Sequence, residues 1–171
     1  YSNRLDLIYK EDINFDKLNF SSKEFWKKSE DLGVVAINYR PYKEFQISLP
    51  KELTDEENIQ LIKKFSLEIF GENYLYTLAI HSPEQKGNKW EKQPHAHIMF
   101  SLKKIDPNID REIEHFLKPY NYRNVKKGGC KVNRDMSKRE FLEEKRELWE
   151  LFINSELEKR KLPLVSKDTL E

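Results

Sequence analysis

Two stretches of sequence decide the fold: Leu75-Tyr-Thr-Leu-Ala-Ile-His81 and Pro94-His-Ala-His-Ile-Met-Phe100. Both are short runs of apolar, β-branched and aromatic residues, which is typical of β-strands. The residues between them, 82–94, include Pro, Gly, Asn, Lys and Glu, a composition typical of a loop. The pattern therefore predicts a β-hairpin, with the end of the first strand beside the start of the second.

Such a hairpin brings together three of the four histidines, His81, His95 and His97. His95 and His97 share one face of their strand because side chains alternate, and His81 meets them from the neighbouring strand. A lone histidine in a strand is more often a packed or surface residue. Three converging imidazoles are different, because neutral imidazole is a common metal ligand and three of them leave positions open for water or substrate. The grouping predicts an open metal site.

The rest of the chain alternates helices and strands without repeats. Residues 42–49 alternate apolar and polar side chains, which predicts a strand. A helix ending near Gly33 and a short helix over 109–117 are also predicted. Three capping-box patterns predict helix starts at Ser21-Ser-Lys-Glu24, Thr54-Asp-Glu-Glu57 and Ser137-Lys-Arg-Glu140. We expect an α/β protein of the α+β type, a two-layer sandwich of a mainly antiparallel central sheet and flanking helices.

Length and composition set further bounds. With 171 residues we expect one domain over 1–163 and a C-terminal tail over 164–171. The single cysteine, Cys130, excludes an intramolecular disulfide framework and fits a reducing, cytoplasmic setting. The sequence has no long apolar run and no signal-peptide pattern at its start. It therefore predicts no membrane-spanning helix. Because the chain begins with Tyr1 rather than Met, we expect the domain to be incomplete at its N-terminus.

A basic segment indicates a polyanionic partner. The whole chain has 31 basic and 30 acidic residues, yet residues 118–139 contain eight basic side chains against Asp135 alone. Lys and Arg bind phosphates and aromatic rings stack on exposed bases, while Gly128-Gly129 predicts a flexible turn. A solvated surface is the alternative. The predicted nucleic-acid contacts are Lys118, Tyr120, Tyr122, Arg123, Lys126, Lys127, Lys131 and Arg134.

The strand over 42–49 adds an acidic group to the candidate site. Its polar face presents Glu44 and Gln46, which can share a sheet surface with the histidines. Glu44 is predicted either to orient a ligand imidazole or to serve as a base, with a solvated strand face as the alternative. Gln46 cannot take up a proton as a base.

Several of these motifs resemble those of the MobA/MobL plasmid mobilisation relaxases. The run Glu44-Phe-Gln-Ile-Ser-Leu-Pro-Lys-Glu-Leu-Thr54 is similar to a strand-to-helix passage of that family. The histidine stretches resemble its metal motif, the histidine-hydrophobic-histidine signature of HUH nucleases. Tyr120-Asn, Lys127-Gly-Gly and Leu148-Trp149 are looser matches, and the resemblance covers roughly residues 42–163.

The resemblance implies a specific chemistry. Relaxases of this family bind single-stranded DNA at an origin of transfer, and a tyrosine attacks one phosphodiester to give a 5′-phosphotyrosine link and a free 3′-OH. It implies that the three histidines hold Mn²⁺ or Mg²⁺, with Zn²⁺ or Ni²⁺ as alternatives, against the scissile phosphate. It also implies accessory relaxosome and coupling proteins as partners in the bacterial cytoplasm, and no membrane.

The resemblance also bears on the nucleophile. Position relative to the Glu44 strand makes Tyr1 the first candidate and Tyr9 the second. If Tyr1 is the nucleophile, the family's first strand, which should pair beside the histidine strands, is absent from this sequence.

Two other functions stay open at this point. A replication-initiation nuclease would use the same chemistry at a different origin. A non-catalytic module would bind single strands in a salt-dependent manner without metal-dependent cleavage. The clustered histidines of nucleotide hydrolases lack this hairpin spacing and the basic segment.

Overall fold

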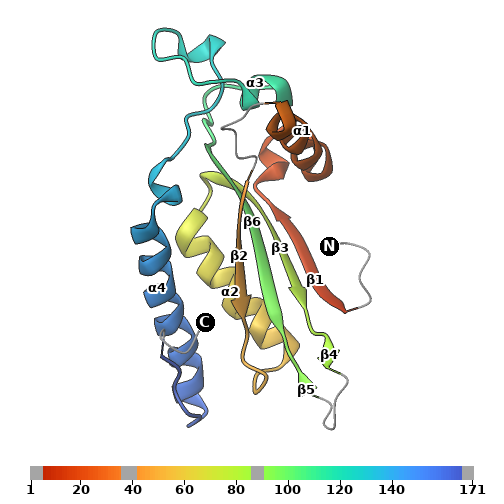
Figure 1. Cartoon of the computed structure of the whole chain (residues 1–171), viewed down its shortest axis with the longest axis vertical. Coiled ribbons are helices and arrows are strands. Elements are labelled where there is room, and N and C mark those ends of the chain that lie inside the picture. Colours follow the sequence, from red (N-terminus) through yellow and green to blue (C-terminus); the bar gives the residue numbers. More distant parts are fainter. Residues whose placement is uncertain (1–5, 36–41, 86–90, 167–171) are drawn as a thin grey trace.

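A four-stranded antiparallel sheet in the order β1-β3-β6-β2 forms the centre of the molecule (Figure 1). The computed structural model describes residues 6–35, 42–85 and 91–166. The strands of the sheet are β1 (Leu7–Ile13), β2 (Lys43–Ser48), β3 (Tyr74–His81) and β6 (His95–Lys104). Between β3 and β6 the chain forms a short ribbon of β4 (Glu84–Gln85) and β5 (Glu91–Lys92). The predicted hairpin is therefore confirmed.

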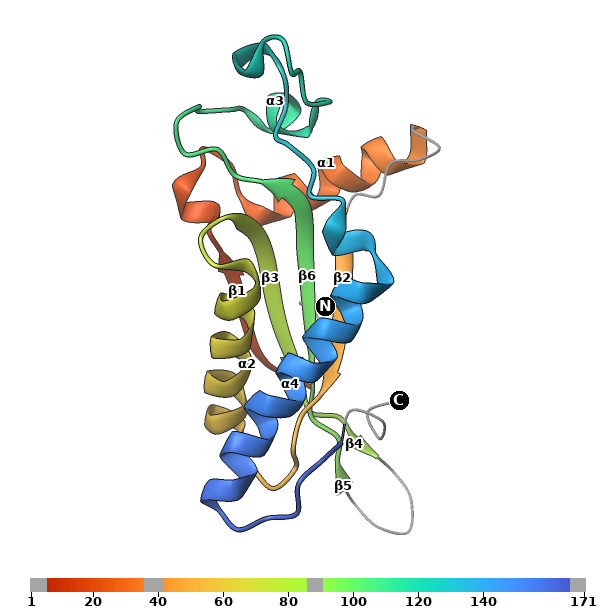
Figure 2. The ribbon, with the colours of Figure 1, turned by 90° about the vertical axis from the view of Figure 1, so that its left-hand side faces the viewer.

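Helices cover the two faces of the sheet unequally. The long helices α2 (Asp55–Phe70) and α4 (Arg139–Lys159) pack together on one face (Figure 2). The helices α1 (Ser22–Val35) and α3 (Ile113–Leu117) pack at one end of the other face, around a second apolar cluster. The predicted α+β class, with an antiparallel sheet and flanking helices, is confirmed.

Strand β3 shows how the sequence builds both layers. All eight of its residues are buried. Tyr76, Leu78 and Ile80 belong to the core under α2 and α4. The alternate residues, which end at His81, face the other way because side chains alternate along a strand. The second half of this other face is left for polar groups, since α1 and α3 cover only its far end.

Two of the three predicted helix caps are confirmed. The Ser21 amide and hydroxyl donate to the Glu24 carboxylate, and the Thr54 amide donates to Glu57 at 2.8 Å. The third is wrong, because Ser137 lies in the short turn η3 (Asp135–Ser137) and α4 begins after Lys138 without a side-chain cap. Backbone bonds close this turn instead: the amide of Ser137 donates to the carbonyl of Arg134 at 3.0 Å.

α1 ends at Val35, near Gly33 as predicted. One predicted helix boundary is wrong. The helix predicted over 109–117 is only α3, because Arg111 is buried and its guanidinium donates to the carbonyls of Gly128 and Val125. Those bonds hold residue 111 outside the helix. No helix in the described ranges is both long and apolar enough to cross a bilayer.

Helix α2 offers a direct test of this packing. Leu61 is 4% exposed and Leu67 is 59% exposed on the same helix. Leu61→Ala should lower the free energy of unfolding by about 2–5 kcal/mol, because it removes buried atoms and leaves a cavity. Leu67→Ala is the matched control and should change it by less than about 0.5 kcal/mol. Urea unfolding followed by circular dichroism measures both, and equal effects would contradict the assigned faces.

Candidate functional site

The histidine cluster lies on the sheet face opposite α2 and α4. The antiparallel register of β3 and β6 pairs His81 directly with His95, and it pairs Ala79 with His97. Ring centroids of the three histidines lie 5.6 Å (81 to 95), 5.5 Å (81 to 97) and 5.1 Å (95 to 97) apart. His81 is fully buried and His97 is 9% exposed. The structure therefore brings together the three histidines that the sequence selected.

Each of the three rings is held at its Nδ1 atom. Nδ1 of His81 lies 3.4 Å from an Asp6 carboxylate oxygen, and Nδ1 of His95 lies 3.1 Å from the Gln93 carbonyl oxygen. Nδ1 of His97 forms a short hydrogen bond with the Glu44 carboxylate. Carboxylates and carbonyls only accept hydrogen bonds, so they favour a proton on each Nδ1 and a lone pair on each Nε2. This arrangement is typical of histidines that bind metal through Nε2.

Three imidazole nitrogens suit a divalent cation, although the three rings stand slightly farther apart than they would around a bound ion. Three imidazoles bound at about 2.1 Å place their ring centroids about 4.5–5.5 Å apart. Two of the observed separations lie at or just above the top of this range. Within the described residues, no three His, Cys, Asp or Glu side chains already meet metal-ligand geometry. Metal binding therefore requires small rotations of the rings.

Glu44 has the geometry of an orienting group. It lies on β2, two residues before Gln46, which pairs with His97 in the register of β2 and β6. The alternating exposure of β2 matches the predicted strand faces. Because its carboxylate already accepts from His97, the arrangement favours the orienting role over that of a free base.

Asp6 and Gln93 were missed by sequence reasoning. Asp6 immediately precedes β1, whose first residue, Leu7, pairs with His81. Only that pairing brings its carboxylate to the histidine, and no local motif marks it. Gln93 acts through its backbone carbonyl, which a search for reactive side chains does not consider.

The two candidate nucleophiles have different outcomes. Tyr1 lies outside the described residues, so its role stays a prediction. Tyr9 lies within β1 and pairs with Ile80, on the face that packs against α2. Its hydroxyl donates to Glu11 at 2.7 Å and accepts from Lys63 of α2 at 3.1 Å, while burial raises its pKa. Tyr9 is therefore wrong as a second candidate, because its ring faces away from the histidines.

Strand β1, near the start of the described residues, lies next to the histidine strand β3 in the sheet. β1 joins β3 in antiparallel register, from Leu7 opposite His81 to Ile13 opposite Tyr76. β1 follows Tyr1 in the chain, so it is not the strand that the family places before its nucleophile, and the expectation that this first strand is missing stays a prediction. β1 also carries the chain from Asp6, at the histidine end, to η1 (Phe15–Lys17) at the other end of the sheet.

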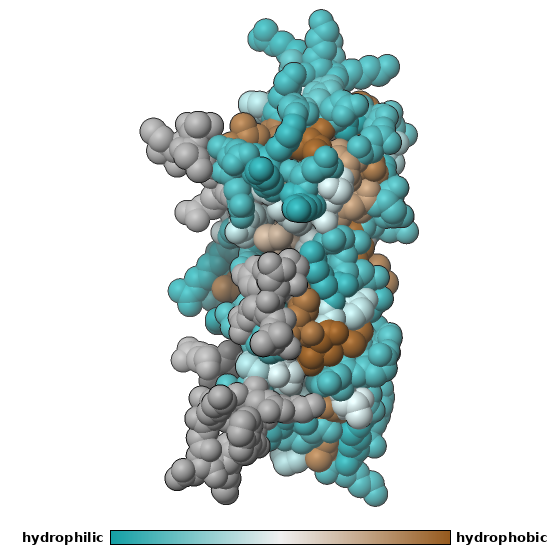
Figure 3. All heavy atoms as spheres, turned by 90° about the vertical axis from the view of Figure 1, so that its right-hand side faces the viewer, coloured by the Kyte–Doolittle hydropathy of each residue, from teal (hydrophilic) through white to brown (hydrophobic). Residues whose placement is uncertain are grey.

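The basic segment lies at the far end of β6 from the histidines (Figure 1). A strand rises about 3.3 Å per residue, so the ten residues of β6 separate the two features by about 30 Å. The end of the molecule that carries the segment presents a hydrophilic surface (Figure 3). The structure does not combine the histidines and the basic segment into one compact site. A polyanion touching both would have to extend along the sheet.

Seven of the eight predicted contacts in this segment are exposed and Tyr120 is partly buried. Tyr122 is 81% exposed and its ring stands edge-on to Tyr120 at 4.8 Å. Lys118, Arg123 and Lys127 share a surface hollow with these two rings. An exposed ring amid cations suits stacking on a base with adjacent phosphate contacts.

Two buried cations hold the segment in place. The Lys103 amine, on β6, donates to the carbonyls of Lys118 at 2.8 Å and Cys130 at 3.2 Å. Arg111 binds two further carbonyls of the segment. Burial lowers the pKa of Lys103 and raises that of the Cys130 thiol. These two cations serve the fold, whereas the cations among the predicted contacts lie at the surface, where a ligand can reach them.

Gly128 and Gly129 are sites of close backbone packing, so the predicted flexible turn is wrong. A Cβ at Gly129 would lie 2.0 Å from the Lys118 carbonyl oxygen, and one at Gly128 would lie 2.3 Å from the Asn121 nitrogen. The Gly129 amide also donates to the Pro119 carbonyl at 3.0 Å. The glycines allow two stretches of the segment to touch.

Comparison with known proteins adds evidence on the family to which the chain belongs. Residues 9–165 match the model of the MobA/MobL family. The chain is 36% identical over 117 residues to the "43 kDa relaxation protein" of Salmonella typhimurium, covering 68% of this chain and 30% of that protein. It is 33% identical over 123 residues to "Mobilization protein A" of Escherichia coli, covering 71% and 16%. The chain therefore belongs to the MobA/MobL family.

A solved structure supports the same assignment. The chain superposes with a TM-score of 0.67 and 28% identity on a chain from "Molecular Basis of Vancomycin Resistance Transfer in Staphylococcus aureus". The match covers 99% of this chain and 79% of that one. By contrast, the chain spans less than a third of the length of the two curated relatives.

The packing of the glycines can be tested by one added methyl group. Gly129→Ala should lower the free energy of unfolding by about 1–3 kcal/mol, because its Cβ meets backbone atoms that cannot rotate away. Lys126→Ala, at an exposed position of the same segment, is the control and should be near neutral. Unchanged stability of Gly129→Ala in thermal or urea unfolding would show that the segment is flexible.

Proposed function

We propose that this chain is the DNA-nicking domain of a plasmid mobilisation relaxase. The observation that carries the proposal is the convergence of His81, His95 and His97, each held at Nδ1, in a chain of the MobA/MobL family. Relatives named relaxation and mobilization proteins support the same role. The substrate in this proposal is single-stranded DNA at an origin of transfer in the bacterial cytoplasm, with relaxosome and coupling proteins as partners.

The three histidines would hold the catalytic cation, with Mn²⁺ or Mg²⁺ as the first candidates and Zn²⁺ or Ni²⁺ as alternatives. When bound, such an ion withdraws charge from a phosphate and stabilises the charge that develops at the phosphorus. Asp6, the Gln93 carbonyl and Glu44 fix the tautomer and the direction of the rings.

The nicking step in this proposal is a transesterification. The Tyr1 hydroxyl oxygen forms a bond to the phosphorus while the bond from phosphorus to the 3′ oxygen breaks. The phenol proton is passed on and the leaving oxygen ends as a free 3′-OH, so the number of phosphodiester bonds is unchanged. Return of the 3′-OH to the phosphotyrosine rejoins the strand. The position of Tyr1 in this step rests on the family resemblance.

The basic segment would bind the same strand away from the cut. Its exposed cations neutralise phosphates and Tyr122 stacks on a base, at about 30 Å from the histidines along β6. Strand binding by the basic segment and cleavage at the histidines would then take place at opposite ends of the sheet. A DNA strand long enough to reach both is the substrate that this geometry favours.

Nicking should depend on the histidines. His97→Ala should abolish cleavage of a supercoiled plasmid carrying the cognate origin, yet leave most single-strand binding, because phosphate contacts dominate affinity. His115→Ala, which alters the one histidine outside the cluster, is the matched control and should nick normally. Agarose gels measure the nicked form. A folded His97→Ala variant that loses binding and cleavage equally would argue against a catalytic metal.

The covalent intermediate identifies the nucleophile. Tyr1→Phe should eliminate a protein–oligonucleotide adduct on a denaturing gel while metal and DNA binding persist. Tyr9→Phe is the matched control and should keep the adduct, since Tyr9 lies on the other face of the sheet. An adduct that survives Tyr1→Phe would move the nucleophile to another tyrosine.

The orienting role of Glu44 can be measured without DNA. Glu44→Ala should weaken Mn²⁺ binding about 10–100-fold in isothermal titration calorimetry, because His97 loses the carboxylate that fixes its Nδ1 proton. His115→Ala should bind Mn²⁺ as the unaltered chain does. Equal affinity in Glu44→Ala would remove Glu44 from the proposed site.

The role of the tyrosine pair can be tested by equilibrium binding to a labelled oligonucleotide. Tyr122→Ala should lose about 1–3 kcal/mol of single-strand affinity through the missing stacking contact. Tyr122→Phe keeps the ring and should retain most of that affinity. If both variants bind as tightly as the unaltered chain, the exposed ring is not a base platform.

A further inference from the structure

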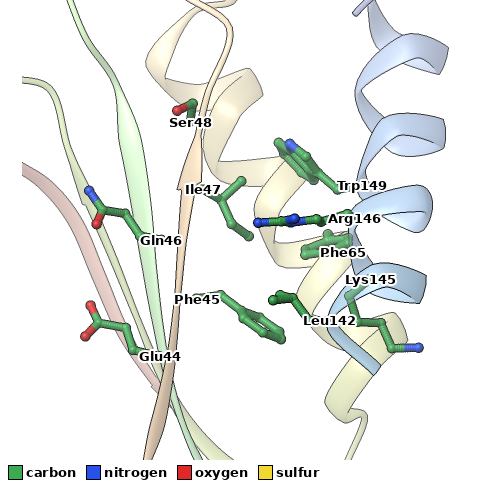
Figure 4. Close-up of a pocket in the computed structure, with 10 residues that line it drawn as sticks. All are labelled: Glu44, Phe45, Gln46, Ile47, Ser48, Phe65, Leu142, Lys145, Arg146 and Trp149. Carbon is green, nitrogen blue, oxygen red and sulfur yellow. The ribbon is translucent and has the colours of Figure 1, made fainter. Parts of the chain in front are cut away.

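A groove lies between the outer edge of β2 and helix α4, on the side of the sheet away from the histidines (Figure 4). Phe45 and Ile47 point into it from β2, and Phe65 of α2 also lines it, nearer to α4. Glu44 and Gln46 also border the groove, although their side chains point to the opposite side of the strand. The backbone of β2 therefore forms one wall.

The edge of β2 at this wall has no strand partner among the described residues. β2 is the last strand in the order β1-β3-β6-β2, and within the described residues it pairs with β6 alone. An edge strand presents backbone N–H and C=O groups that readily accept an added strand. The apolar side chains that line the groove, which include Ile47 of β2 and the exposed Leu142 of α4, can contact side chains of such a strand.

The opposite wall contains a hydrogen-bond donor without an acceptor. Trp149 is 4% exposed, and in the described part of the chain its buried indole Nε1–H has no hydrogen-bond partner. In Figure 4 its ring lies on α4 and faces β2 across the groove. An unmade hydrogen bond on a buried donor is costly, so an occupant that supplies a carbonyl or carboxylate oxygen is favoured.

Cations mark the rim of the groove. Arg146 is exposed and forms no ion pair within the described ranges. The amine of Lys145 lies 3.6 Å from a Glu144 carboxylate oxygen and over the Phe141 ring. In Figure 4 the Arg146 guanidinium extends toward β2, whereas the Lys145 amine points away from β2 although the residue lines the groove. The rim therefore complements an acidic side chain, and the wall beneath it complements an apolar one.

We infer that this groove binds an extended peptide segment of a partner protein, in which acidic and apolar side chains alternate, as a strand added to the outer edge of β2. Backbone hydrogen bonds to β2 supply affinity, and alternate side chains supply specificity through the apolar wall and Arg146. Trp149 is only 4% exposed, so its ring offers no open face on which a base could stack. A nucleic acid therefore fits this groove less well.

Peptide binding to the whole chain tests the inference. The probes are two panels of fluorescein-labelled ten-residue peptides in which Val or Leu alternates with Glu in one panel and with Lys in the other. Fluorescence anisotropy should show saturable binding for members of the acidic panel only. Arg146→Glu should weaken that binding at least tenfold, and Trp149→Phe, which keeps a ring but removes the N–H donor, should weaken it several-fold.

Arg139→Glu is the matched control, because Arg139 lies on the same helix, is exposed and does not line the groove. It should bind the acidic peptides as the unaltered chain does. Hydrogen exchange should show new protection of β2 amides when peptide is bound. The inference is overturned if no acidic peptide binds, if Arg139→Glu weakens binding as much as Arg146→Glu, or if a ten-residue oligothymidine protects the β2 amides instead.

Discussion

The antiparallel register between β3 and β6 is the constraint on which the rest of the structure depends. It places His81 directly opposite His95 and keeps His97 on the same face two residues later. A slip of β6 by one residue would turn His95 and His97 into the core under α2 and α4 and bring Ala96 and Ile98 to the other face. The burial of Ala96 and Ile98, at 1% and 0% exposure, makes such a slip costly. The core thus fixes the position of the candidate metal ligands.

The same register gives the two faces of the sheet different roles, one in core packing and one in holding the histidines. One face is packed with aromatic and aliphatic residues from α2 and α4. On the other face, α1 and α3 cover one end, and the histidines with their carboxylate partners occupy the opposite end. Edge strand β2 contributes to both faces, because Glu44 reaches His97 while Phe45 packs into the core.

Local sequence patterns made several strands, helix α2 and the grouping of the histidines predictable. Apolar periodicity located β2, β3, β6 and α2, and the reciprocal side-chain bonds at Thr54 and Glu57 follow from a four-residue pattern. The three histidines could be grouped because a hairpin joins near neighbours in the sequence. What depends on distant pairing was missed: Asp6 meets His81 only through the β1–β3 ladder, 75 residues apart in the chain.

The basic segment shows a second limit of sequence reasoning. Its charge was evident, but its distance from the histidines is set by the length of β6, and its order is set by Lys103 and Arg111. A buried lysine and arginine look like any other cations in the sequence. Likewise, the glycine pair suggested flexibility, although it allows close backbone contact. Tertiary contacts decided both features.

Anomalous X-ray diffraction from crystals of the protein soaked in Mn²⁺ would locate the metal. One strong manganese peak is expected amid the rings of His81, His95 and His97, and it should be lost in crystals of His97→Ala. A peak elsewhere in the molecule, or none at concentrations that saturate binding in solution, would contradict the assignment of these three histidines as a metal site.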